Sequence, residues 1–359
     1  MKIKANIVTD KDCFFGEIEF DSIIKSISKI GPENQSENYL YPGFIDLHCH
    51  GGGGHDVMEG EASIRQMLRL HKKFGTTSLL LTTVTDTQMK LDSVFKDIAK
   101  VIATPQLEEA NILGVHLEGP FLSSQKLGAQ PNYVRPFSLK EIKKYHAIAP
   151  IKILTLAPES GIKEDEIKEL KNLGIILQLG HSNATYEEAK DFINDHCQSI
   201  THLFNAMSSF HHRAPGVVGA CLAHANCAEL IPDLIHVHPG AIKLALRSIP
   251  DLYFVTDATA ASGMPDGEYH LGQHHVTKCS NGVRLKDGTL AGSSLTLNQA
   301  LQNLLTLGLS PSESSRRLSS IQANLLNVLD RGAIKVGARA DFALTSLNGA
   351  LKLVIKEGI

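Results

Sequence analysis

Short apolar runs alternate with amphipathic segments along most of the chain. Between residues 43 and 258, eight runs rich in β-branched and other large apolar side chains are separated by stretches with helical spacing, which predicts alternating strands and helices. The predicted strands cover residues 43–50, 76–85, 112–119, 151–158, 175–182, 199–206, 230–237 and 252–258. Pro232 lies inside the seventh run, although proline cannot donate a hydrogen bond to a neighbouring strand.

Helix boundaries between these runs are marked by local signals. Three Ser or Thr residues are each followed three positions later by Glu or Gln, which predicts capping boxes. The pairs are Ser63 with Gln66, Ser138 with Glu141, and Thr185 with Glu188. Ser310 followed by Pro311 predicts a further helix start, and Gly75 and Gly174 stand where helices are expected to end. Eight strands alternating with helices predict an α/β protein with a (β/α)8 TIM barrel.

The two ends of the chain follow a different pattern. Residues 1–41 and 333–359 contain short β-like runs around turns, without helical periodicity. We expect these two segments to pair into one small β-sandwich domain, beside a barrel domain formed by residues 42–332.

Composition narrows the class of protein. The 359 residues are 43% hydrophobic and 20% charged with a net charge of −3, so we expect neither nucleic acid nor an anionic membrane as a partner. Six cysteines without CxxC spacing argue against a disulfide framework and favour a reducing compartment. No run reaches the roughly 20 apolar residues of a membrane-spanning helix, and MKIKANIVTD lacks the apolar stretch of a signal peptide. A cytoplasmic protein is expected.

Polar residues follow the predicted strands at their C-terminal ends, where barrel active sites lie. In GFIDLHCHGGGG, His48 and His50 either hold a metal or only end a strand, and the glycines either let backbone approach a ligand or form a plain loop. The other strand ends carry Glu118, His181, His202, His236 and Asp257. A structural histidine has no reason to favour one end of a strand, so this distribution favours a metal site. Histidines within helical segments, such as His71 and His146, are expected at the surface.

Six motifs in this order resemble the amidohydrolase superfamily, and within it the N-acetylglucosamine-6-phosphate deacetylases. They are PGFIDLHCHG (42–51), HLEGPF (116–121), LGHSNAT (179–185), THLFNAM (201–207), VTDA (255–258) and GTLAGS (288–293). The resemblance implies metal-dependent hydrolysis of the N-acetyl group of N-acetylglucosamine 6-phosphate, giving glucosamine 6-phosphate and acetate in amino-sugar catabolism or cell-wall recycling.

The resemblance also implies a metal centre. Glu118, His181 and His202 match the main ligands of the family, and one carboxylate with two imidazoles suits Zn or Fe at a catalytic site. His48 and His50 are present in only some members of the family and complete a second position, so one or two divalent ions per chain are expected. Asp257 matches the catalytic aspartate, which also belongs to the metal site.

Recognition of the substrate is implied in the same way. Arg213 and His236 match phosphate-binding positions, with Arg213 supplied by a neighbouring subunit, which implies a homodimer. The other matching substrate positions are Ala129, Asn205, Ala206, Leu290, Ala291 and Gly292. Gln130 departs from the family, which usually has histidine there to polarise the substrate carbonyl. Glutamine can still donate a neutral hydrogen bond.

Other functions stay open at this point. The Gln130 difference leaves room for the galactosamine epimer or another N-acyl sugar as substrate. A different amidohydrolase would not need Arg213 and His236 and would ignore the phosphate. A non-catalytic sugar-phosphate-binding protein on the same fold is a further alternative, although silent relatives commonly lose some of the metal-site residues that are intact here.

Overall fold

The computed structural model describes all 359 residues and confirms the mixed α/β class. Its centre is a curled six-stranded parallel sheet in the order β12-β11-β10-β9-β8-β5. The strands are β5 (Phe44–Asp46), β8 (Thr76–Thr83), β9 (Asn111–Glu118), β10 (Ile151–Leu156), β11 (Ile176–Leu179) and β12 (Ser199–Ile200). A two-stranded parallel sheet continues the series with β13 (Cys227–Leu230) and β14 (Asp251–Phe254).

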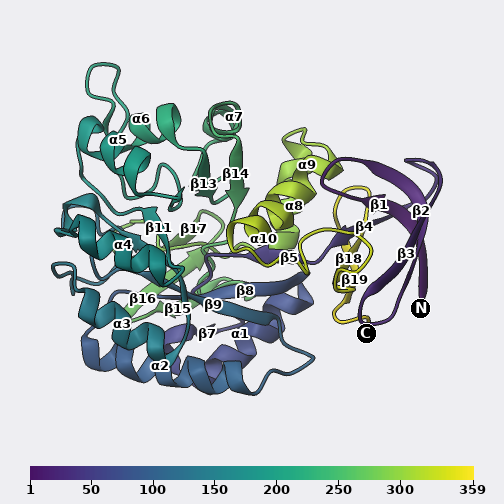
Figure 1. The fold of residues 1–359 in the computed structure, drawn as a ribbon, viewed down its shortest axis with the longest axis horizontal. Coiled ribbons are helices and arrows are strands. Elements are labelled where there is room, and N and C mark those ends of the chain that lie inside the picture. Colours follow the sequence, from purple (N-terminus) through teal and green to yellow (C-terminus); the bar gives the residue numbers. More distant parts are fainter.

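Helices follow these strands and cover the sheet from outside (Figure 1). They are α1 (Glu61–Lys73), α2 (Gln88–Ala103), α3 (Leu139–Ile148), α4 (Glu164–Asn172), α5 (Tyr186–Asp195), α6 (Gly216–His224), α7 (Pro239–Ser248), α8 (Leu297–Thr306), α9 (Pro311–Ser315) and α10 (Ile321–Leu325). Short helical turns are Val57–Glu59, Pro158–Ser160 and the π-helical Arg316–Ser320. The predicted caps Ser138, Thr185 and Ser310 are confirmed, because each side chain accepts a hydrogen bond from the N3 backbone N–H.

Several local predictions are wrong, among them a helix cap, the position of the seventh strand and the length of the sixth, which is Ser199–Ile200 rather than 199–206. The cap predicted at Ser63 is not one, because α1 begins two residues earlier after Gly60, whose φ of 101° needs glycine. The seventh strand is Cys227–Leu230 rather than 230–237, since Pro232 and the turn around Asp233 end the strand early. The site residues that follow this strand therefore lie in a loop.

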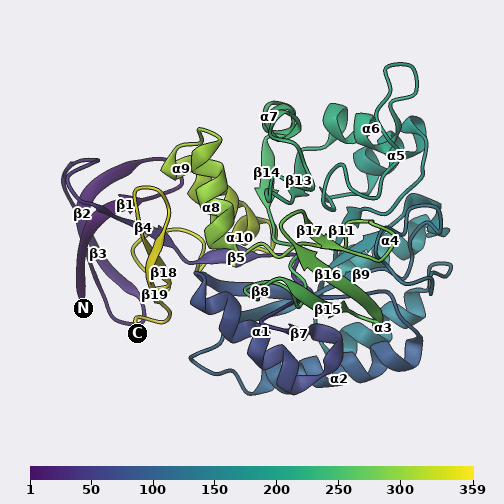
Figure 2. The same cartoon turned by 180° about the vertical axis from the view of Figure 1, so that it is seen from behind.

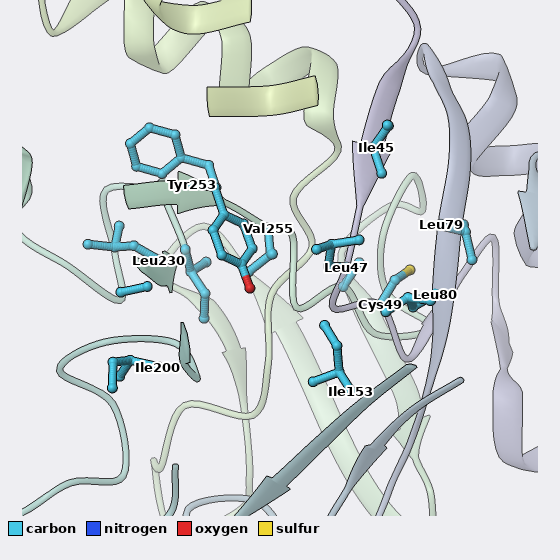
Figure 3. Packing of buried hydrophobic residues seen from close by; sticks show 14 of the residues in the cluster. Ile45, Leu47, Cys49, Leu79, Leu80, Ile153, Ile200, Leu230, Tyr253 and Val255 are labelled. Atoms are coloured by element: carbon cyan, nitrogen blue, oxygen red, sulfur yellow. The ribbon is translucent and has the colours of Figure 1, made fainter. Parts of the chain in front are cut away.

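One continuous cluster of 76 buried apolar residues joins both parallel sheets to the helices. Figure 3 shows side chains from the region of β5, β8, β10, β12, β13 and β14 gathered together, including Leu47, Ile153 and Tyr253. The shared core holds the C-terminal ends of all eight strands at one side of the molecule.

The terminal segments form a separate six-stranded sheet in the order β19-β18-β4-β1-β2-β3. Its strands are β1 (Lys2–Val8), β2 (Cys13–Phe20), β3 (Ile24–Pro32), β4 (Asn38–Pro42), β18 (Phe342–Ser346) and β19 (Leu351–Ile355). Figures 1 and 2 show the purple N-terminal and yellow C-terminal strands side by side. Antiparallel pairing of β18 with β4 joins the two ends of the chain.

A three-stranded antiparallel sheet between β14 and α8 was not expected from the sequence. It consists of β15 (Gly267–Leu271), β16 (His274–Cys279) and β17 (Gly282–Arg284). Hydrogen bonds fix the turn between β15 and β16. Gly272 N–H donates to Asp56, 2.9 Å away, and Gln273 donates to both oxygens of Asp86. Leu271 is thereby held near the C-terminal ends of the parallel strands.

Of the glycines after His50, Gly52 packs against helix α1, whereas Gly53 and Gly54 form the turn between two short strands. Gly51 and Gly52 form β6, which pairs with β7 (His55–Asp56). A Cβ on Gly52 would lie 2.7 Å from Leu70 and 2.8 Å from His71 Nε2, so only glycine fits against α1. The surface location expected for His71 is wrong, because it is fully buried and bonds Gly51 O at 2.8 Å.

Candidate metal centre

Six polar side chains converge where the parallel strands end. Glu118 is the last residue of β9, and the others follow their strands by two to four residues. They come from four further strands: His48 and His50 after β5, His181 after β11, His202 after β12 and Asp257 after β14. All six are buried. Parallel strands thus bring together residues more than 200 positions apart in the sequence.

One group consists of Glu118, His181 and His202. Glu118 Oε1 lies 2.9 Å from His181 Nε2 and 3.1 Å from His202 Nε2, and the two Nε2 atoms are 3.0 Å apart. The three atoms therefore point at a common centre.

A second group consists of His48, His50 and Asp257. The two histidine Nε2 atoms are 3.1 Å apart, and Asp257 Oδ1 lies 3.2 Å from His50 Nε2 and 3.5 Å from His48 Nε2. Glu118 stands between the groups, because its Oε2 is 3.2 Å from His50 Nε2.

These separations fit bound ions. Metal–ligand bonds of about 2.0–2.1 Å in a tetrahedral site place neighbouring donor atoms about 3.3 Å apart. The donor separations in both groups lie between 2.9 and 3.5 Å. The residues present therefore suit one divalent ion in each group, with Glu118 able to contribute to both.

Oxygen acceptors hold the far nitrogen of three of these rings. His181 Nδ1 donates to Lys126 O at 2.9 Å, His50 Nδ1 to Thr82 O at 3.1 Å, and His48 Nδ1 to Glu229 at 2.6 Å. A protonated Nδ1 leaves the lone pair on Nε2, and such contacts orient metal-ligating histidines.

The electrostatics of the cluster favour positive charge on its imidazoles. Burial disfavours the charged form of His50, yet hydrogen bonds with Asp257 and Glu118 raise its pKa to about 9. Burial also works against ionised Asp257, but the charge of His48 and the hydrogen bond with His50 lower the pKa of that carboxyl to about 2. Buried carboxylates that stay ionised among imidazoles create a site in which a divalent cation can replace protons.

Three of the six residues have unusual backbone. His181, His202 and Asp257 have φ values of 48°, 24° and 49°, in the left-handed region. Such conformations cost on the order of 1–3 kcal/mol each and cluster at functional sites. The strain aims these three side chains into the site directly after their strands end.

A cavity of about 200 Å³ opens onto the two groups. Most residues predicted for the site line it, namely His50, Glu118, Ala129, Gln130, His181, His202, Asn205, Ala206, His236, Asp257, Leu290 and Gly292. His48 is completely buried behind the cavity, and Ala291 is buried with its N–H donating to Val283 O. Arg213 lies outside, on an exposed loop, where it contacts His212.

Two lining residues have fixed orientations. His236 Nδ1 lies 2.7 Å from Asp233 Oδ2, which leaves Nε2 as the free ring nitrogen. The Gln130 carbonyl oxygen accepts from Thr85 N–H at 2.8 Å, and its amide nitrogen donates to Glu118. In this structure Gln130 therefore holds a candidate metal ligand.

Comparison with known proteins places the chain among its relatives. A family model described as the amidohydrolase family matches residues 39–359. The chain belongs to the amidohydrolase family. Members of this family typically use a divalent metal, which agrees with the two groups of candidate ligands.

Individual relatives of this amidohydrolase cover nearly the whole chain. The N-acetylglucosamine-6-phosphate deacetylase of Lysinibacillus sphaericus is 38% identical over 334 residues, covering 90% of this chain and 85% of that protein. The N-acetylgalactosamine-6-phosphate deacetylase of Escherichia coli O157:H7 is 35% identical over 331 residues, covering 89% and 87%. The crystal structure of N-acetylglucosamine-6-phosphate deacetylase from Thermotoga maritima has a TM-score of 0.89 and 34% identity, covering 100% of this chain and 98% of that one.

Sequence reasoning missed several residues of the amidohydrolase site. Gly128, Leu271 and Thr289 line the cavity, and Glu229 contacts His48 from behind. Thr289 lies within the motif GTLAGS, and Gly128 lies two residues before Gln130. Their nearness to predicted site residues could therefore have indicated both positions. The sequence contained no signal for Leu271 and Glu229, because their positions depend on an unexpected hairpin and on a misplaced strand.

The structure has no helix long and apolar enough to cross a membrane.

Proposed function

We propose that the protein hydrolyses the N-acetyl group of N-acetylglucosamine 6-phosphate to glucosamine 6-phosphate and acetate, in amino-sugar catabolism or cell-wall recycling. One observation carries the proposal: a single cavity is lined by the candidate metal ligands Glu118, His181 and His202, and also by Asp257 and His236. Relatives that match about nine-tenths of the chain are named for this activity.

Glu118, His181 and His202 would hold one divalent ion, and His48, His50 and Asp257 a second. Imidazole and carboxylate ligands suit Zn or Fe. Bound there, a divalent ion supplies Lewis-acid polarisation of the amide carbonyl and activation of water. The protein's own part is to arrange these ligands and to direct their Nε2 atoms into the site.

Asp257 is the proposed general base and acid. Its carboxylate is buried at the cavity wall, and its low pKa keeps it ionised at neutral pH. In this state it can accept the proton of the attacking water. The same carboxylic acid then returns the proton to the amine nitrogen as the amide C–N bond breaks.

The remaining proposed contacts position the sugar phosphate. His236, oriented by Asp233, offers Nε2 to the phosphate, and Asn205, the Ala206 backbone, Ala129 and residues 290–292 contact the sugar. Arg213 would reach the phosphate from a neighbouring subunit of a homodimer, where a guanidinium matches phosphate oxygens. Its exposed position outside the chain's own cavity supports that arrangement.

We propose one (β/α)8 barrel for residues 42–332. In support, His50 N–H donates to Ala258 O and Asp257 N–H to His48 O, both at 2.9 Å, so the last strand segment bonds to the first. Residues 1–41 and 333–359 would form the small β-sandwich domain, which has its own cluster of 11 buried apolar residues. A cytoplasmic location is also proposed, because all six cysteines are free thiols.

N-acetylgalactosamine 6-phosphate is the second candidate substrate. The Escherichia coli relative named for that activity matches this chain almost as well as those named for the glucosamine compound. The two sugars differ only in the configuration of one hydroxyl. Leu271 and Thr289 are further residues of the cavity wall.

Acetate release by Zn- or Fe-loaded protein tests the proposal. N-acetylglucosamine 6-phosphate is compared with the unphosphorylated sugar and with the galactosamine epimer. We expect turnover that requires the phosphate and is fastest with the glucosamine compound. Equal turnover with and without phosphate would overturn the phosphate site, and preference for the epimer would select the second candidate.

A further inference from the structure

Glu229 is a buried carboxylate directly behind the cavity. It lies on β13, is fully buried, and does not line the cavity wall. One of its oxygens, Oε1, lies 2.6 Å from His48 Nδ1, which is also fully buried. A carboxylate in such a position needs strong partners, because burial of an unpaired charge is costly.

Backbone and hydroxyl groups hold this carboxylate in place. His202 N–H donates to Oε1 at 3.0 Å, and the Tyr253 hydroxyl donates to Oε2 at 3.3 Å. The Glu229 backbone carbonyl accepts from Leu203 N–H at 2.9 Å. One side chain on the seventh strand therefore contacts both histidine-bearing segments, after β5 and after β12.

The contact with His48 decides which ring nitrogen is free. Because a carboxylate oxygen only accepts, Nδ1 carries the proton and Nε2 faces the site. That Nε2 is 3.1 Å from His50 Nε2 and 3.5 Å from Asp257 Oδ1, at separations that fit a shared ion. The opposite tautomer would place a proton where the ion is expected.

We propose that Glu229 is the positioning residue for the second metal position: it fixes the tautomer and orientation of His48, so that His48, His50 and Asp257 can bind an ion. The inference rests on the metal centre of the proposed function. Removing such an outer carboxylate typically weakens metal binding 10- to 100-fold.

Two variants separate positioning from simple filling of space. Glu229→Gln keeps the size and an oxygen that can accept from His48 and His202, but it removes the charge. Glu229→Ala removes the acceptor as well. Tyr253→Phe is the matched control, because it removes a different bond to the same carboxylate and leaves the His48 contact intact.

The experiment is titration of metal-stripped full-length protein with Zn²⁺ against a chromophoric chelator, with metal content per chain measured afterwards. Wild type and Tyr253→Phe are each expected to bind two ions. For each ion, the affinity of the variant should lie within about threefold of that of wild type. Glu229→Gln should weaken the second ion about 10-fold and Glu229→Ala about 100-fold, with the first ion much less affected.

Unchanged second-ion binding in Glu229→Gln and Glu229→Ala would overturn the proposal, as would a wild-type protein that binds only one ion. Equal weakening of both ions would assign Glu229 a general structural role instead. If the variants do not fold, nitrogen NMR of ¹⁵N-histidine-labelled wild type decides, with His48 assigned from His48→Asn. A proton on Nε2 in the metal-free neutral ring contradicts the proposal. Failure of the acetate-release test would leave these metal measurements unaffected.

Discussion

Replacing Asp257 with Asn tests the proposed proton transfers. The two side chains have nearly the same size, so the cavity wall and the packing against His48 and His50 are kept. What is lost is the carboxylate that can accept a proton. The group formed by Glu118, His181 and His202 does not include Asp257, so an ion held there should remain.

The size of the effect follows from the surroundings of Asp257. Other proton acceptors on the cavity wall have other proposed roles: Glu118, His181, His202 and His50 would hold metal ions, and the free Nε2 of His236 would bind the phosphate. The proposal therefore assigns no second base to the reaction. A positioned acid–base group typically contributes about 10²- to 10⁴-fold. Because Asp257 serves in both transfers, we expect a loss near the upper end, about 10⁴-fold in kcat or about 5.5 kcal/mol in the barrier.

Acetate release at saturating substrate, with metal per chain measured on the same sample, checks this prediction. Asp195→Asn is the matched control, since Asp195 is exposed at the end of α5 and should leave kcat unchanged. If Asp257→Asn kept more than about a tenth of kcat with metal bound, Asp257 would not be the general base.

Three further predictions follow from individual contacts. Arg213→Ala should raise KM for the phosphorylated sugar about 10- to 100-fold without changing metal content, because hydrogen bonds between charged groups contribute about 1.5–3 kcal/mol. An unchanged KM in steady-state kinetics would contradict the role of Arg213. Gln130→Ala should lower kcat at least about 10-fold, since its amide holds Glu118, and full activity would show that this bond is dispensable. Glu141 is expected to stabilise the fold by about 1–2 kcal/mol above pH 5 through Arg135. Burial opposes ionisation of Glu141, but Arg135 lowers its pKa below 4.5. The difference in unfolding free energy between wild type and Glu141→Gln should therefore shrink as the pH falls below 4.5. A difference that does not change with pH in chemical denaturation would refute the assignment.

Much of the site followed from the sequence because parallel strands repeat one geometry. The C-terminal ends of such strands share one side of the fold, so residues as distant as His48 and Asp257 could be predicted to meet. Their roles as ligands and base remain predictions. The mixed α/β class was also predictable, since β8 and β9 are rich in Leu, Ile, Val and Thr and alternate with amphipathic helices.

What the sequence did not reveal depends on tertiary context. Both strands of the β15–β16 hairpin carry many exposed polar residues, including His270 and His275, so little apolar alternation marked them. Glu229 was overlooked because the seventh strand was placed three residues too late, which left it before the strand rather than within it. The burial of His71 depends on contact with Gly51, and helical spacing alone does not contain that information.

The pairing of β18 with β4 bears on how the chain is made. On the ribosome, β4 is complete at Pro42, but its partner begins only at Phe342. At about 5–20 residues per second, the roughly 300 intervening residues take about 15–60 s to synthesise. During that time one edge of β4, with the apolar Tyr39, Leu40 and Tyr41, lacks its neighbour, and open strand edges promote aggregation. The small sheet is thus completed only after all the parallel strands have been made, and a nascent chain that stalls before residue 342 leaves this edge open to other chains.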